Sequence, residues 1–194
     1  MIICFIAWGS LLWNNDTLKL ENEWKKSNVK LPLNFSRISD GGNGRLTLVI
    51  DKDGILNNVY YGKTKISQLN IAINILKNRE KTSFENIGYI NILNNTKRTA
   101  TLDEKYIQLL INSAKKNKID AFVWSDLQPN FKKITGNEFT TENAIDYINS
   151  KKDDKNKYNT ILEYIFLSKI YGNIHTHFSN KITKYLVMKN QRQY

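Results

Sequence analysis

The sequence has 194 residues, of which 41% are hydrophobic and 24% are charged. This length and composition are those of an ordinary globular protein and exclude a disordered or fibrous chain. We expect a single domain over residues 1–194, because the chain has only two prolines, no internal repeat and no Pro/Gly-rich linker.

The formal net charge of +11 raises the question of nucleic acid binding. Most of this charge comes from lysines that are dispersed singly and in pairs, and no block of five or more basic residues occurs. The chain is also rich in isoleucine and asparagine, whose codons are A/T-rich like those of lysine, so genome composition can supply lysine without a functional demand. The pattern therefore favours a solvated basic surface over a nucleic-acid partner.

The chain begins with an apolar run, Ile2 to Trp8, that stops at Gly9-Ser10. The run has no basic n-region and is too short for a signal sequence or a membrane span, so it predicts a strand buried on both faces. The single cysteine, Cys4, lies in this run and cannot form an internal disulfide. We therefore expect a core thiol in a reducing compartment, which indicates a cytoplasmic protein with no membrane partner.

Strand signals dominate the next segment. Two strands, over residues 35–39 and 45–51, flank the glycine-rich turn 41–44 and predict a hairpin. A second turn, 51–54, leads into a strand over residues 58–62. The first third of the chain is thus predicted to be a β-meander that follows a central strand.

Helical spacing starts at Ile66 and predicts a helix that ends near Asn78, with Ser67 as its N-cap. A strand over residues 85–93 follows, and a capping box at residues 101–104 opens a second helix.

A short apolar strand is predicted over residues 119–125. Thr140 or Thr141 caps a helix to about Ile148, and a longer helix from Tyr158 is stopped by Gly172. Strands first and interleaved helices later predict an α+β, or mixed α/β, fold around a curved sheet.

Two places in the sequence are candidates for chemistry. At the end of the first strand, Gly9 lets the backbone turn so that successive N–H groups point at one bound anion, and Ser10 adds a hydroxyl group. At the end of the helix that starts at Ile66, Glu80 can reach into a cleft over the sheet. Each feature also has a simpler interpretation, because the first can be a plain strand-ending turn and the second a solvated, charged helix end.

Together the two places resemble the motifs of the γ-glutamylcyclotransferase-like superfamily, which includes ChaC-type glutathione-degrading enzymes and γ-glutamylamine cyclotransferases. Its first strand ends in a Tyr-Gly-Ser-Leu type loop, here Trp8-Gly9-Ser10-Leu11, followed in the ChaC branch by Ile/Leu-Trp-Asn, here Leu12-Trp13-Asn14. Its catalytic glutamate follows a helix in a Leu-x-x-Arg-Glu setting, matched here by Leu76-Lys77-Asn78-Arg79-Glu80. The resemblance spans about the first half of the chain. Segments of the second half, such as 121–127, are similar to a bacterial branch with no characterised activity.

The resemblance implies a curved or barrel-like mixed sheet with flanking helices. It implies an enzyme that releases 5-oxoproline from a small γ-glutamyl amine or peptide, when the α-amine attacks the γ-carbonyl. Glu80 would be the general acid/base, and the loop residues Trp8, Gly9, Ser10 and Leu11 would bind the glutamyl group. The reaction needs no metal and no organic cofactor. Trp8 departs from the usual loop tyrosine, because it keeps an aromatic wall and lacks the phenol hydroxyl.

The alternative is a non-catalytic small-molecule-binding or interaction protein that keeps the same fold, since fold does not imply function. Tyr60, Tyr61 and Tyr89 are candidate cleft hydroxyls, and we expect Tyr89, on the strand after Glu80, to contact substrate. His175 and His177 flank Thr176 on one side of an extended segment, but a nearby carboxylate at ligand spacing is missing, so we expect no metal site there.

Overall fold

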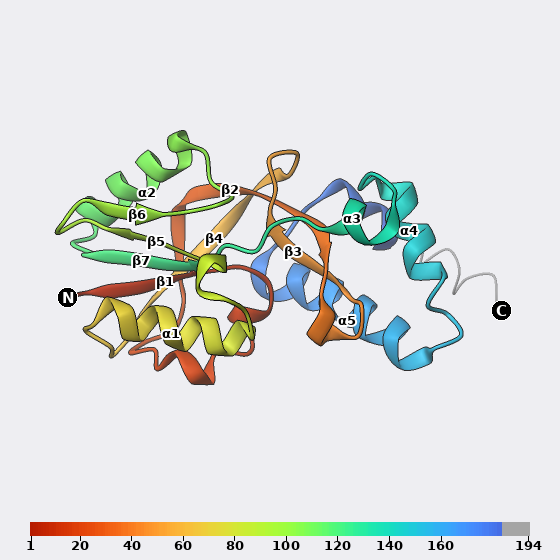
Figure 1. Ribbon diagram of the computed structural model, residues 1–194, viewed down its shortest axis with the longest axis horizontal. Helices are drawn as coiled ribbons and strands as arrows, with labels where there is room; N and C mark the ends of the chain where they lie inside the picture. Colours follow the sequence, from red (N-terminus) through yellow and green to blue (C-terminus); the bar gives the residue numbers. More distant parts are fainter. Residues whose placement is uncertain (184–194) are drawn as a thin grey trace.

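The computed structural model describes residues 1–183, and its centre is a seven-stranded mixed sheet (Figure 1). The strands are β1 (Ile3–Ala7), β2 (Lys25–Ile38), β3 (Leu46–Ile50), β4 (Ile55–Lys63), β5 (Ile87–Asn91), β6 (Thr96–Arg98) and β7 (Ala121–Ser125), in the order β3-β2-β4-β1-β7-β5-β6. The neighbours β1 and β7 are parallel, and the other pairs are antiparallel. The α+β class is therefore confirmed. The barrel-like form is wrong, because β3 and β6 are free edges and the sheet does not close.

Helices cover both faces of this sheet. They are α1 (Leu69–Glu80), α2 (Glu104–Lys116), α3 (Phe131–Thr135), α4 (Thr141–Asn149) and α5 (Lys155–Gly172), and residues 177–183 are also helical. Helix α1 packs on one face, whereas α2 and α5 pack into the core on the other face (Figure 1). Across residues 1–183, no helix is both long and apolar enough to cross a membrane.

Strand β1 is buried on both faces, as its continuous apolar run predicted. Side chains alternate along a strand, so Cys4 and Ile6 pack into the core cluster with α2 and α5, whereas Ile3 and Phe5 pack against α1. Cys4 is a core thiol, and burial raises its pKa to about 12. The thiol therefore stays protonated and unreactive at neutral pH.

The predicted hairpin of β2 and β3 is confirmed, but the predicted meander is wrong. Strand β2 lies between β3 and β4, and Leu33 pairs with Ile50 on one side and with Ile55 on the other. The turn that joins β3 to β4 approaches β2 at Gly54, where an added Cβ atom would lie 2.7 Å from the backbone of Leu33. Glycine at this position permits that close approach, which a meander would not require.

Helix ends differ from prediction where a side chain has another partner. The predicted capping box fails because the Thr101 hydroxyl group bonds the Asp126 carboxylate, so α2 starts at Glu104 after Asp103. Helix α4 starts as predicted, because the side-chain oxygen of Thr140 accepts a hydrogen bond from the N–H of Asn143, the third residue of the helix.

Two further helices end at residues in the left-handed conformation. Helix α1 runs two residues beyond the predicted end at Asn78, and Lys81, with φ of 51°, terminates it after Glu80. Helix α5 includes Gly172 and is terminated by Asn173, with φ of 48°. Asparagine tolerates this conformation better than most residues, so it ends a helix as glycine does. The longer α1 makes Glu80 its last residue, which places that carboxylate at the helix end.

Candidate functional site

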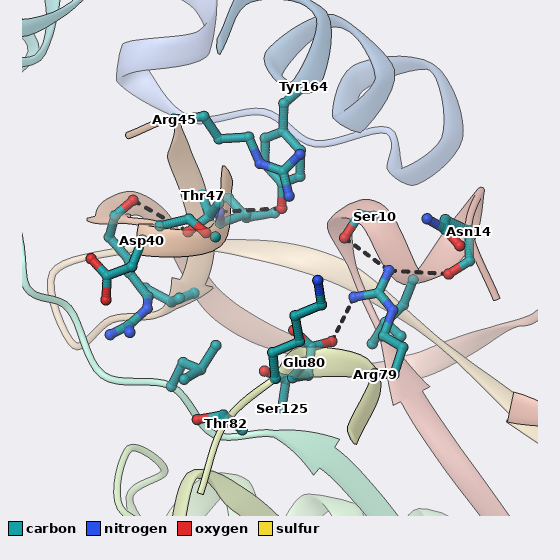
Figure 2. Close-up of a pocket in the computed structure, with 18 of the residues that line it drawn as sticks. Ser10, Asn14, Asp40, Arg45, Thr47, Arg79, Glu80, Thr82, Ser125 and Tyr164 are labelled. Carbon is teal, nitrogen blue, oxygen red and sulfur yellow. Dashed lines mark hydrogen bonds and ion pairs between the residues drawn. The ribbon is translucent and has the colours of Figure 1, made fainter. Parts of the chain in front are cut away.

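A cavity of about 680 Å³ lies where the end of β1 meets the end of α1, the hairpin of β2 and β3, and helix α5 (Figure 2). Its two sides come from different parts of the chain. We call one side the loop wall, which consists of Trp8, Ser10, Leu11, Asn14, Arg79 and Glu80. We call the other side the hairpin wall, which consists of Arg37, Asp40, Arg45, Thr47, Leu48 and Tyr164.

Glycine is required at position 9 of the turn that ends β1. Gly9 has φ of +58°, in the left-handed region that other residues rarely adopt. An added Cβ atom there would lie 2.5 Å from the hydroxyl oxygen of Tyr164, which is closer than any van der Waals contact. Gly9 therefore lies behind the wall and allows α5 to approach, while its neighbours Trp8, Ser10 and Leu11 line the cavity.

Trp8, which follows β1, donates a hydrogen bond to the hairpin wall. Its indole Nε1 donates to the carbonyl oxygen of Leu48 at 3.1 Å, and the N–H of Leu48 donates to the Tyr164 hydroxyl oxygen at 3.4 Å. All three groups are buried. The backbone of Leu48 thus joins the two walls of the cavity.

Arg79 joins the two motifs that were predicted separately from the sequence. Its guanidinium donates to the Ser10 hydroxyl oxygen at 3.1 Å and to the Asn14 carbonyl oxygen at 3.0 Å. Its other terminal nitrogen forms an ion pair with the Glu80 carboxylate at 2.6 Å, and both side chains are 13% exposed. The contacts bring Glu80 and Ser10 to one wall of one cavity (Figure 2).

The charges that line the cavity favour an anionic ligand. Four cationic and two anionic side chains line it: Arg37, Arg45, Arg79, Lys81, Asp40 and Glu80. Burial lowers the pKa of Arg37, and the nearby Asp40 carboxylate opposes that shift. Burial also raises the pKa of Tyr164, so its hydroxyl group stays protonated at neutral pH.

Tyr89 does not line this cavity. It is half-buried on β5, where its ring packs against the second core cluster and lies 5.2 Å from the guanidinium carbon of Arg98. Tyr60 and Tyr61 pack against the two core clusters and are likewise not among the lining residues. None of these three tyrosines is therefore placed to contact a ligand in the cavity.

The two histidines lie elsewhere. The ring of His175 is 3.0 Å from the side-chain oxygen of Asn173, and its backbone N–H donates to Asn57. Within residues 1–183, no group of three or more histidine, cysteine, aspartate or glutamate side chains is arranged to hold a metal ion.

Most of the hairpin wall was missed from the sequence. Arg37, Arg45 and Tyr164 come from β2, the end of the hairpin turn and α5, and no motif marks them. One signal was available, because the chain has only five arginines among its 29 basic residues and three of them line the cavity. In a lysine-rich chain, the rarer arginines mark positions that need a planar, bidentate cation.

Comparisons of the chain with protein-family models, with curated proteins and with solved structures find no match. The function of the protein therefore has to be inferred from the residues that line the cavity.

Proposed function

We propose that the protein is a cyclotransferase that releases 5-oxoproline from a small γ-glutamyl amine or peptide. The observation that carries this proposal is that Glu80 and the Ser10-Leu11 turn line one cavity, where Arg79 connects them. The resemblance of both motifs to the γ-glutamylcyclotransferase-like superfamily supports the same function.

In the proposed reaction, the α-amine of the γ-glutamyl group attacks its own γ-carbonyl carbon. A new carbon–nitrogen bond closes the five-membered ring, and the original amide bond to the leaving amine breaks. The α-amine is mostly protonated at neutral pH, so Glu80 accepts its proton and then transfers a proton to the leaving amine. Correct positioning supplies much of the acceleration, because the reacting groups belong to one molecule.

The loop wall has the groups that this substrate needs. The backbone amides of Ser10 and Leu11, which line the cavity, would hold the glutamyl group in the bent conformation that ring closure requires. The Ser10 oxygen accepts its bond from Arg79, which leaves the hydroxyl hydrogen free to donate to substrate. The reaction uses neither a metal nor an organic cofactor, and the buried Cys4 thiol is consistent with a reducing cytoplasm.

The experiment is an assay of 5-oxoproline release from a panel of γ-glutamyl amines and peptides. We expect Glu80→Gln to lower kcat by about 10²–10⁴-fold, the usual effect of removing a general acid/base. Glu163→Gln is the matched control, because Glu163 is an exposed glutamate on α5. Failure of the whole panel to give product, or full activity in Glu80→Gln, would contradict the proposal.

A second candidate function is ligand binding without catalysis. The observation in its favour is the 2.6 Å ion pair with Arg79, which occupies one oxygen of the carboxylate that the reaction uses. A binding protein would bind a γ-glutamyl compound, which calorimetry detects, and would release no 5-oxoproline from it in the assay above.

A further inference from the structure

Arg45 differs from the other arginines in residues 1–183. Arg37, Arg79 and Arg98 each donate hydrogen bonds to protein oxygen atoms. Arg45 has neither a hydrogen-bond acceptor nor an ion-pair partner in the described part of the chain, and its Nε atom is buried without a partner. A buried donor without an acceptor is rare in folded proteins, and a bound ligand would supply the acceptor that this guanidinium lacks.

The guanidinium of Arg45 is held by stacking. Its central carbon lies 4.5 Å from the ring centroid of Tyr164, a contact that fixes the plane of the group without using its N–H donors. Figure 2 shows the guanidinium beside the Tyr164 ring, across the cavity from Glu80. The donors of Arg45 are therefore oriented in advance on the hairpin wall.

The neighbouring charges leave Arg45 as the anion-binding group of that wall. Arg37 already donates to the Gln128 carbonyl oxygen at 2.8 Å, and Asp40 acts on the pKa of Arg37. A guanidinium with free donors binds a carboxylate in bidentate geometry, which a lysine cannot do.

We infer that Arg45 is a carboxylate-binding subsite that recognises the leaving amine of the substrate. The inference rests on the proposed function, in which the loop wall holds the glutamyl group, so the leaving amine extends toward the hairpin wall. The cavity of about 680 Å³ is within the range of small-molecule sites. The preferred substrate is then a γ-glutamyl compound whose leaving amine carries a carboxylate, and not one with a neutral leaving amine.

The test compares γ-glutamylglycine with γ-glutamylglycinamide, which differ only in whether the leaving amine carries a carboxylate. We expect the wild-type protein to prefer γ-glutamylglycine by about 10–100-fold in kcat/KM, as for other hydrogen-bonded charge pairs. In Arg45→Gln the ratio falls to about one, because only the carboxylate substrate loses its partner, and Arg45→Lys restores part of the preference.

Lys116→Gln is the control, because it removes one positive charge from an exposed position at the end of α2. It should leave the ratio unchanged. The ratio in the wild-type protein is decisive even where Arg45→Gln does not fold, since equal rates for the two substrates would overturn the subsite.

A binding measurement separates this inference from the proposed function. N-Glutarylglycine keeps both carboxylates of γ-glutamylglycine but lacks the α-amine, so it cannot cyclise. It is titrated calorimetrically into wild-type protein and Arg45→Gln, and we expect at least about tenfold weaker binding in the variant. Arg45-dependent binding of N-glutarylglycine without 5-oxoproline release from the substrates would support the subsite and overturn the cyclotransferase. Release of 5-oxoproline at the same rate from both substrates, or N-glutarylglycine binding that does not depend on Arg45, would overturn the subsite.

Discussion

The two walls of the cavity use their arginines differently. On the loop wall, Arg79 donates to Ser10 and Asn14 and pairs with Glu80, so protein groups already satisfy it. On the hairpin wall, Arg45 stacks on a ring and keeps its donors free. The first arrangement fixes the position of the Glu80 carboxylate, whereas the second leaves guanidinium N–H groups without a protein acceptor. A site that performs chemistry on an anionic substrate needs both properties, because reactive groups must be preorganised and a ligand must supply the missing partner.

The comparison of the two walls depends on the close contact between Gly9 and the Tyr164 hydroxyl, which holds them together. Gly9→Ala tests that contact, and we expect it to lower the free energy of unfolding by about 3 kcal/mol, because the left-handed conformation and the clash with the Tyr164 hydroxyl both disfavour a Cβ atom. Urea denaturation followed by circular dichroism measures the change.

The control for Gly9→Ala is Gly136→Ala. Gly136 also has positive φ, of +77°, but a Cβ atom there would meet nothing within 4 Å, so we expect a loss of about 1 kcal/mol from conformation alone. Tyr164→Phe removes the clashing oxygen, and the double variant with Gly9→Ala should be more stable than the sum of the single effects. Equal losses for the two glycine variants would mean that the walls do not meet at Gly9.

Arg79→Met tests whether the loop wall depends on its internal pairing. The change leaves the Glu80 carboxylate without its partner in a largely buried position, and we expect a loss of about 2 kcal/mol in unfolding free energy, between the values for exposed and fully buried pairs. Adding Glu80→Gln removes the unpaired charge, so the double variant should recover part of that loss.

The measurement for Arg79→Met is again urea denaturation, at low and at high salt. Recovery of stability in the double variant indicates coupling between the two charges. Additive losses would show that the ion pair contributes nothing to the wall, and the contrast with Arg45 would then fail.

Features that depend on neighbours in the chain could be predicted from the sequence. The apolar run of β1, the turn at Gly9-Ser10 and the end of α1 near Glu80 follow from local spacing and glycine chemistry. The loop wall was therefore accessible to prediction, because both of its segments carry motifs. Arg79 was seen only as part of a motif, since its bonds to Ser10 and Asn14 join segments that are distant in sequence.

The hairpin wall could not be predicted because its members meet through tertiary packing. Tyr164 is one apolar-face position of a long helix, and its contact with Gly9 follows only from how α5 packs over the sheet. The strand order β3-β2-β4 could not be predicted either. A short turn normally joins strands that are neighbours in the sheet, but the turn from β3 to β4 passes close to β2 at Gly54, and β2 lies between the two strands. Tyr89 was predicted to contact substrate because its strand follows Glu80 in the sequence. In the sheet, Tyr89 pairs with Val123 of β7 and does not line the cavity.

Tyr147→Phe concerns the support of the hairpin wall and has the smallest expected effect. The Tyr147 hydroxyl on α4 donates to the carbonyl oxygen of Gly44, directly before Arg45, at 2.5 Å. We expect the free energy of unfolding to fall by about 1 kcal/mol, the usual net value of one hydrogen bond, and to stay unchanged in the control Tyr171→Phe, whose ring is half exposed.

The same phenol makes stability depend on pH. Burial raises the pKa of Tyr147 from 10.0, so the unfolded chain ionises this phenol first and the free energy of unfolding falls as the pH rises above that value. Urea denaturation at pH 8 and above pH 10 should therefore show a smaller pH-dependent loss in Tyr147→Phe than in the wild-type protein. An identical loss in both would mean that this phenol does not hold the hairpin, and the free donors of Arg45 would need another support.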